Sequence, residues 1–278
     1  MNLNDALQIL ERYGITTELK SYKVYEEINK IGDSLSEPEH IILFETFWYL
    51  GNKERGSNVS LSENLKMKII RNRHNISRYD MAADGHFEGS NIPDIIRSCN
   101  LNGSEEAEVW SIFHKEWHHD SARDCEEINS ALGTYKVIES KLKWFGKINV
   151  LDIGCGKNGN GIATLTARYN GKINGYGIDL DIQAHPSNVK LIKASVDHLP
   201  FADKFFHVVY SSNVIYYFKD ERLVNIIKEI LRVLKPKGMF VFDKTGKSFN
   251  DYKDNIIPLT GIKARVLKYN NAILTIKY

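Results

Sequence analysis

The sequence predicts an α/β fold, a doubly wound and mostly parallel sheet with an antiparallel C-terminal hairpin, preceded by a helical N-terminal domain. From residue 148 onward, short β-branched runs alternate with amphipathic helical patterns, which indicates βαβ units. Near the C-terminus, Asn270 and Asn271 separate two further apolar runs, a pattern typical of a hairpin. The first hundred residues instead read as helices joined by polar turns.

The sheet domain is expected to span residues 104–278. Its predicted strands are Ile148–Ile153, Asn174–Leu180, Val189–Ala194, His207–Ser211 and Met239–Asp243, followed by the hairpin strands Lys263–Lys268 and Ala272–Lys277. Two helices are expected between them, at Ile162–Tyr169 and Glu221–Leu234.

The helical N-terminal domain is expected to span residues 1–103 and to serve acceptor selection or pocket closure. A first helix starts at Leu3 and has Gly14 as its C-cap, and a third covers Leu61–Arg73. The second follows the start signal Ser36-Glu37-Pro38 and is closed by Gly51. Residues 75–103 lose the helical period and gather glycines, so they are predicted to form a linker or lid.

A helix with an acidic first turn is predicted to begin at Ser104 and open the second domain. Trp110, Phe113 and Trp117 follow at three- and four-residue steps. This stripe is expected to pack against the sheet domain.

Composition places the 278-residue chain among globular proteins of the cytoplasm. The apolar share of 42% suffices for a core, and no apolar run approaches the roughly 20 residues of a membrane span. The amino terminus shows no signal-peptide pattern, and three scattered cysteines without a C-x-x-C pair make a disulfide framework improbable. No membrane partner is expected, and the sequence does not indicate the oligomeric state.

The net charge of +2 conceals an asymmetry, because residues 1–149 carry 18 Lys and Arg against 24 Asp and Glu. An acidic N-terminal half disfavours nucleic acid as a partner. One exception is the basic strip Lys66–Arg78, which holds five basic and no acidic residues. We interpret it as a solvated helix face, with phosphate contact as the alternative.

A glycine-rich turn follows the first predicted strand, in the run Val150-Leu151-Asp152-Ile153-Gly154-Cys155-Gly156. Glycines there allow positive φ and a close approach of the backbone to a ligand. Gly154, Gly156 and Gly159 also satisfy the dinucleotide fingerprint, so a nicotinamide or flavin enzyme is an alternative. Asp152 argues against it, because a carboxylate there would repel a pyrophosphate but suit a cationic ligand.

These residues resemble the class I S-adenosylmethionine (SAM)-dependent methyltransferases, in particular those with small-molecule acceptors. Four segments occur in the family's order over roughly the last 130 to 170 residues: V-L-D-I-G-C-G at 150–156, G-Y-G-I-D-L at 175–180, H-L-P-F at 198–201 and V-L-K-P-K-G at 233–238. The resemblance implies a Rossmann-like domain that binds SAM and transfers its methyl group.

The resemblance also implies which residues contact the cofactor. Asp179 would grip the two ribose hydroxyls, a role that its position about twenty residues after the glycine turn independently favours. Ser195 stands where relatives often carry an acid for adenine, and His207 replaces the usual aspartate and is interpreted as structural. The expected cofactor contacts are Asp152, Gly154, Cys155, Gly156, Asp179, Leu180, Ser195, Val196 and Ser211.

Three residues are catalytic candidates. Tyr216 and Tyr217 follow the fourth strand, where ligands of open α/β sheets bind, and could orient or deprotonate an acceptor. His118 lies on the helix that precedes the first sheet strand and could act as a base near neutral pH. His114 shares its helix face, but no further ligand pair has metal-site spacing, so no metal is predicted.

The sequence therefore predicts a SAM-dependent methyltransferase that acts on an O, N or C nucleophile of a small metabolite or peptide-like acceptor. Two alternatives stay open. The first is a nucleic-acid or protein methyltransferase that docks through the basic strip, and the second is a non-catalytic SAM-binding sensor or partner-binding module.

Overall fold

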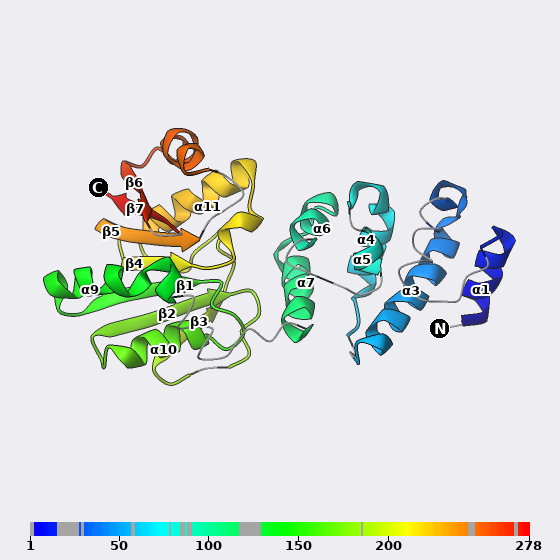
Figure 1. Ribbon diagram of the computed structural model, residues 1–278, viewed down its shortest axis with the longest axis horizontal. Coiled ribbons are helices and arrows are strands. Elements are labelled where there is room, and N and C mark those ends of the chain that lie inside the picture. Colours follow the sequence, from blue (N-terminus) through cyan, green and yellow to red (C-terminus); the bar gives the residue numbers. More distant parts are fainter. Residues whose placement is uncertain are drawn as a thin grey trace. The chain divides into compact units, whose positions relative to one another are not determined.

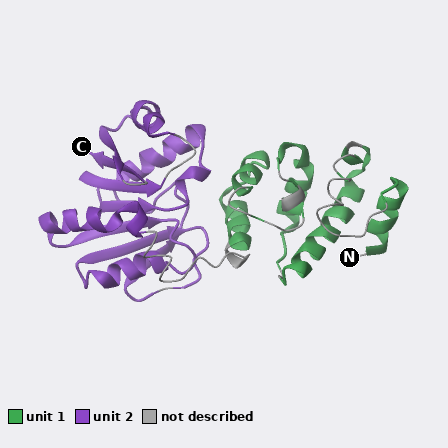
Figure 2. Cartoon of the chain, viewed as in Figure 1, with its two compact units in different colours: residues 1–117 green, residues 118–278 purple. Residues whose placement is uncertain are grey.

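The computed structural model describes residues 3–15, 28, 31–56, 59–77, 79–83, 87, 91–116, 129–184, 186–243, 248–269 and 272–278. The chain divides into two compact units, Met1–Trp117 and His118–Tyr278 (Figure 2). Within the described residues, no helix is both long and apolar enough to cross a membrane.

The second unit contains a seven-stranded sheet in the order β3-β2-β1-β4-β5-β7-β6 (Figure 1). Strands β1 to β5 pair in parallel and β6 and β7 form an antiparallel hairpin, as predicted. Strand β7 also pairs antiparallel with β5. The strands are β1 (Ile148–Ile153), β2 (Ile173–Asp179), β3 (Val189–Lys193), β4 (Phe206–Ser211), β5 (Leu234–Asp243), β6 (Ala264–Tyr269) and β7 (Ala272–Lys277).

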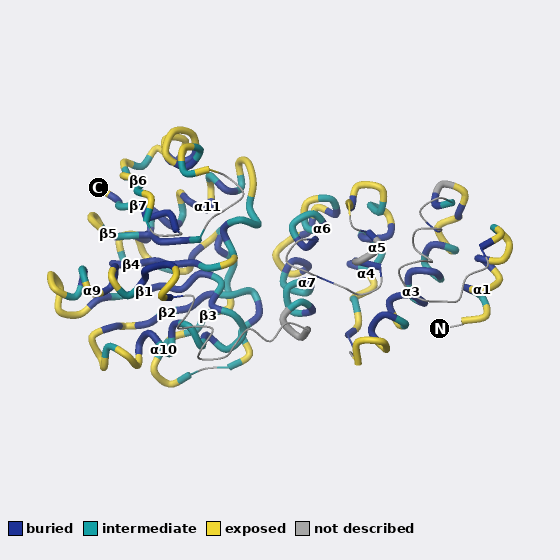
Figure 3. The backbone as a smooth tube through the Cα atoms, viewed as in Figure 1, coloured by how far each residue is buried: buried dark blue, intermediate teal, exposed yellow. Residues whose placement is uncertain are grey.

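Helices cover both faces of this sheet, because the parallel strands are buried on both sides and read as continuous apolar runs. Val150 and Val208 face a core shared with helices α9 and α10, whereas Leu151 and Val209 face a core shared with α11. Figure 3 shows the central strands buried along most of their length. The helical segments are α9 (Thr134–Phe145), α10 (Asn160–Arg168), η3 (Ile215–Tyr217), α11 (Asp220–Val233), η4 (Asp251–Ile256) and α12 (Ile257–Leu259).

Strand β5 begins earlier than predicted. The chain passes from α11 directly into Leu234, which pairs with Phe206, and a register shift follows before Met239 pairs with Val208. The segment Lys235-Pro236-Lys237-Gly238 therefore reads as a turn in the sequence although it lies within an irregular strand.

The first unit is helical in its described residues. Two predictions fail there: α3 continues through Gly51 to Glu54, and residues 75–103 are not a linker. They contain two helices, and Phe87, Ile92 and Ile95 are fully buried in the core of the unit. The elements are α1 (Leu3–Arg12), η1 (Gly32–Ser34), α3 (Glu37–Glu54), α4 (Glu63–Arg71), η2 (Arg73–Asn75), α5 (Tyr79–Ala83), α6 (Ile92–Ser98) and α7 (Gly103–Glu116).

Helix α7 belongs to the first unit, which corrects the predicted boundary between residues 103 and 104. Val109 and Ile112 are buried in the core of this unit, and Trp110 and Phe113 pack against it rather than against the sheet. The division falls after Trp117. Of the predicted stripe, Trp110 and Phe113 are partly buried and Trp117 lies outside the described residues, and spacing alone does not say which core a stripe faces.

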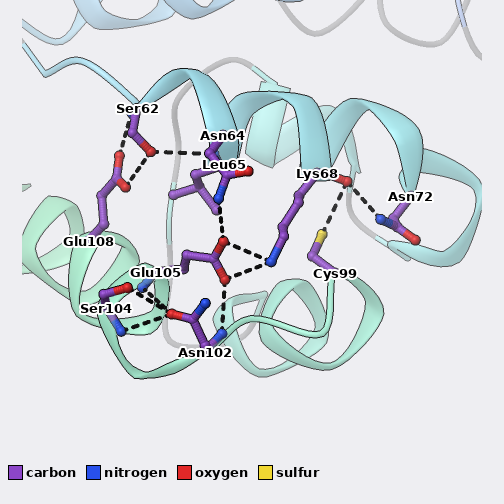
Figure 4. A network of polar contacts seen from close by, with 10 residues as sticks. All are labelled: Ser62, Asn64, Leu65, Lys68, Asn72, Cys99, Asn102, Ser104, Glu105 and Glu108. Atoms are coloured by element: carbon purple, nitrogen blue, oxygen red, sulfur yellow. Dashed lines mark hydrogen bonds and ion pairs between the residues drawn. The ribbon is translucent and has the colours of Figure 1, made fainter.

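The start of α7 is fixed by polar contacts rather than by Ser104. The Asn102 side chain accepts hydrogen bonds from the backbone N–H groups of Ser104 (3.1 Å) and Glu105 (3.3 Å), so Asn102 caps the helix (Figure 4). Glu105 is buried, and its carboxylate accepts hydrogen bonds from Lys68 Nζ and Asn64 Nδ2 of α4. This network joins α4 to α7.

Three cations of the basic strip form ion pairs within the first unit. Lys66 pairs with Glu45 and Glu63, Lys68 pairs with Glu105, and Arg71 pairs with Glu37. Glu63 lies on α4 itself, whereas Glu37, Glu45 and Glu105 lie on other helices, which the sequence of the strip alone does not reveal. Arg78 lies outside the described residues.

Candidate functional site

The glycine-rich turn joins β1 to α10 at the carboxyl edge of the sheet. Gly154 and Gly156 both have φ near +71°, a left-handed conformation that L side chains rarely adopt. A Cβ on Gly154 would lie 2.1 Å from Val214 Cγ2, so glycine is also required for space. The backbone N–H groups of Gly154 and Cys155 both donate to Ile178 O, which holds the turn against β2.

Asp179 ends β2 and fixes the same turn. Its Oδ2 accepts the backbone N–H of Gly156 at 2.9 Å, and its Oδ1 accepts that of Asp181 at 3.1 Å. Asp179 and the following Leu180 are half-buried. A carboxylate has about four acceptor positions, so one carboxylate can both hold a turn and accept hydrogen bonds from a ligand diol.

Asp152 lies one strand away, at the end of β1, and is 6% exposed. Burial raises the pKa of its carboxyl to about 7, opposed by a hydrogen bond that the Tyr210 hydroxyl donates to Oδ2 at 2.9 Å. The negative charge of Asp179 adds to the increase in this pKa. A cationic ligand group near Asp152 would favour the ionised carboxylate. The sequence analysis missed Tyr210, although its register opposite Asp152 follows from pairing strands β1 and β4.

Two predicted contact residues point into the protein. Cys155 is 7% exposed, and its Sγ lies 2.7 Å from the position of a Cβ on Gly177. Ser211 is fully buried, and its hydroxyl donates to Ile153 O at 3.1 Å. Only the backbone of these two residues is therefore available to a ligand.

Ser195 and Val196 follow β3 in a loop that an ion pair holds in place. Ser195 Oγ donates to Asp197 Oδ2 at 2.7 Å, and Arg222 from α11 donates to both oxygens of Asp197. Burial would raise the pKa of Asp197, but the Arg222 and Ser195 hydrogen bonds outweigh it and leave this pKa lowered. Val196 is 7% exposed. The loop therefore offers a ligand its backbone groups, because the Ser195 hydroxyl already donates to Asp197.

Asp243, like Tyr210, was not among the predicted site residues. It ends β5 next to β4, and its Oδ2 accepts Asn213 N (2.5 Å) and Ser212 Oγ (3.0 Å). Its Oδ1 is buried without a hydrogen-bond partner in the described part of the chain. Burial raises the pKa of this carboxyl. The available signal was an acid that closes a buried strand at the ligand-binding edge.

Tyr216 and Tyr217 form a pair in η3, directly after the loop that follows β4 and contains Ser212 and Asn213. The Tyr216 hydroxyl donates to that of Tyr217, and the ring centroids are 4.0 Å apart. Burial raises the pKa of both hydroxyls, so the neutral phenol is the favoured form of each. The pair can orient a ligand by hydrogen bonding, whereas removing a proton from that ligand is disfavoured.

The fold thus brings the glycine turn, Asp152, Asp179, Ser195 and the tyrosine pair to one edge of the sheet. His118 lies outside the described residues. His207 sits at the opposite edge, where Nδ1 accepts Asn149 N at 3.0 Å, and burial lowers its pKa to about 4. This placement is consistent with the structural interpretation of His207.

The arrangement fits the cofactor that the resemblance implies. Positive-φ glycines allow a ligand to approach the turn, Asp179 is an acid beside the turn of the type that binds a diol, and Asp152 is a buried carboxyl suited to a cationic group.

Comparisons with known proteins agree with this interpretation. Residues 151–242 match the family described as "Methyltransferase domain". The sterol 4-C-methyltransferase strm-1 of Caenorhabditis elegans is 33% identical over 130 residues, which cover 42% of this chain and 37% of the relative. The match thus spans little more than a third of that relative's length.

Solved structures also align with this chain. One is a SAM-dependent methyltransferase from Aquifex aeolicus, with 17% identity, a TM-score of 0.37, and coverage of 56% of this chain and 96% of the other. Another is a protein from Pyrococcus horikoshii OT3, with 18% identity, a TM-score of 0.40, and coverage of 59% and 97%. The family match runs from β1 into β5, so this part of the second unit is similar to a methyltransferase domain.

Proposed function

We propose that this chain transfers the methyl group of SAM to a small-molecule or peptide-like acceptor. The observation that supports the proposal is the hydrogen bond from Gly156 N to Asp179 Oδ2, because it holds the acid that we propose for the ribose against the glycine turn. In this proposal Asp152 and the turn hold the methionine part, Asp179 and Leu180 the ribose, and the Ser195–Val196 loop the adenine. Cys155 and Ser211 contribute backbone groups.

When bound, SAM supplies an activated methyl group on a sulfonium. The chain's own residues then have to orient the acceptor, exclude water and, for an O–H or N–H acceptor, take up a proton. Asp243 is suited to the last task, because its Oδ1 has no hydrogen-bond partner in the described part of the chain and burial raises its pKa, which makes the carboxylate a stronger base. The Tyr216–Tyr217 pair is suited to orientation. His118 remains a second proposed base.

The first unit is proposed to select the acceptor. All the motifs proposed for the cofactor lie in the second unit, and the ion pairs of the basic strip leave little of it for phosphate docking. A small or peptide-like acceptor is therefore preferred over nucleic acid.

Calorimetry with SAM, S-adenosylhomocysteine and NAD tests the proposal. Wild-type protein should bind the first two, and Asp179→Ala should lose hydrogen bonds to a charged group worth about 1.5 to 3 kcal/mol each. The exposed Asp254→Ala is the matched control and should bind as wild type. Binding of NAD but neither adenosyl ligand would overturn the proposal.

A transfer assay separates catalysis from simple binding. Methyl-labelled SAM is incubated with the protein and a cell extract divided into small molecules and macromolecules. Label in the small-molecule fraction supports the proposal, whereas label only in nucleic acid or protein contradicts the acceptor class. Cofactor binding without any labelled product would favour a sensor.

A further inference from the structure

The edge of the sheet opposite the glycine turn concentrates positive charge. It consists of the segments 143–147, 170–172, 202–205, 235–238 and 261–263, which we call the basic edge. The acid in these segments is Asp203, which pairs with Arg232. Every lysine of the basic edge is exposed except the half-buried Lys235, and the seven are Lys143, Lys147, Lys172, Lys204, Lys235, Lys237 and Lys263.

Hydrogen bonds join segments of the basic edge. Ile148 N donates to Lys172 O at 3.0 Å, which links segment 143–147 to segment 170–172. Lys141 Nζ donates to Lys237 O, which links α9 to segment 235–238 of β5. Tyr278 N donates to Lys263 O at 3.1 Å. The lysines come from separate parts of the sequence, so only the sheet places them together.

Two aromatic side chains project from the same edge. Trp144 and Phe145 end α9 and are 86% and 51% exposed, and Trp144 is the most exposed of the large apolar side chains in the described part of the chain. The Phe145 ring lies 4.8 Å from that of His207, which anchors it to β4. An exposed tryptophan among lysines is typical of proteins that rest on a membrane interface.

We propose that the basic edge docks on an anionic lipid surface. Trp144 and Phe145 would enter the interface between headgroups and acyl chains, and the lysines would face the negative headgroups. All seven cations are lysines, whose point charges suit a laterally mobile anionic surface, whereas nucleic-acid contacts favour the bidentate geometry of arginine. The glycine turn lies at the other end of the strands and stays uncovered.

This inference is independent of the proposed activity, and it departs from the expectation that the chain has no membrane partner. The earlier expectation rested on the lack of an apolar run long enough to span a membrane. A docking edge needs only exposed aromatics and clustered charge, and neither forms a continuous segment.

Vesicle flotation with the full chain tests the inference. Vesicles of phosphatidylcholine alone should not retain the protein, whereas vesicles that also contain phosphatidylserine should, and high salt should release it. Removing three charges in K143Q/K147Q/K172Q should weaken partitioning by about a hundredfold, at about fivefold for each lysine. The matched control K219Q/K228Q/K253Q removes three exposed lysines outside the basic edge and should partition as wild type.

Insertion of the aromatic side chains has its own readout. Addition of the mixed vesicles should shift tryptophan emission to shorter wavelength, and Trp144→Ala should abolish the shift and weaken partitioning by about tenfold. Circular dichroism melts check that each variant is folded. No retention of wild type, equal loss in both lysine triples, or an unchanged emission shift in Trp144→Ala would overturn the proposal. Salt-sensitive binding to duplex DNA or self-association, without vesicle binding, would assign the edge to another partner.

Discussion

The Tyr210 hydroxyl donates a 2.9 Å hydrogen bond to Oδ2 of Asp152, its register partner on the neighbouring strand β1. Burial raises the pKa of Asp152 to about 7, and this hydrogen bond is the contact that opposes the increase. A residue of β4 therefore limits how far burial raises the pKa of the carboxyl at the base of the proposed cofactor site.

The first prediction concerns proton linkage. A cationic ligand favours ionised Asp152, so binding of SAM near pH 6 should release a proton. Tyr210→Phe should raise the pKa further, weaken SAM binding at pH 7 and move proton release to higher pH. Calorimetry in two buffers of different ionisation enthalpy measures both quantities. Tyr169→Phe removes a hydroxyl that contacts Tyr135 and Glu139, and serves as the control. Unchanged affinity and proton release in Tyr210→Phe would contradict the assignment.

The second prediction concerns stability of the ligand-free protein. Because the folded pKa of Asp152 lies above the ordinary carboxyl value of about 4, the folded state keeps a proton that the unfolded state has lost. The contribution of Asp152 to the free energy of unfolding should therefore fall as pH rises from about 4 to 7 and then level off. The slope should be at most about 1.4 kcal/mol per pH unit. Asp152→Asn should remove this component in urea melts across that range. An identical pH dependence in the variant would show that Asp152 titrates normally.

The third prediction distinguishes the cost of a steric clash in the glycine turn from the cost of a left-handed backbone conformation. Gly154→Ala and Gly171→Ala both introduce a Cβ at φ above +70°, but only the first meets a neighbour, Val214, at 2.1 Å. Gly171→Ala should cost about 1 kcal/mol of stability from conformation alone. Gly154→Ala should cost more and also weaken binding of S-adenosylhomocysteine. Equal effects of the two substitutions on stability and binding would indicate that packing against Val214 is unimportant.

The fourth prediction addresses the proposed base. Asp243→Asn retains a side-chain oxygen for Ser212 and Asn213 but cannot accept the acceptor's proton. Methyl transfer should fall by about a hundredfold or more, while calorimetric binding of SAM stays unchanged. The same assay on His118→Gln compares the second candidate. If Asp243→Asn keeps full activity from pH 6 to 9 and His118→Gln does not, the base is His118.

The sequence by itself determined the elements of the sheet domain. The alternation of β-branched runs with amphipathic helices depends on local periodicity, so β1 was predicted with its observed bounds, and the glycine turn was recognised from residue type and spacing. Asp179 was found in the same way, because its distance from the turn follows from the length of one helix and one strand. The antiparallel hairpin followed from its two alternating runs.

Only the tertiary structure decided which surfaces meet. The stripe of α7 has the same period whichever core it faces, and Val109 shows that it faces the first unit. Pairing of β4 with β1 placed Tyr210 on Asp152, and the end of β5 brought Asp243 to Asn213. The partners in these contacts are 30 or more residues apart in the chain. Local periodicity specifies each strand and its faces but not the order in which strands pair, and that order creates both the candidate site and the basic edge.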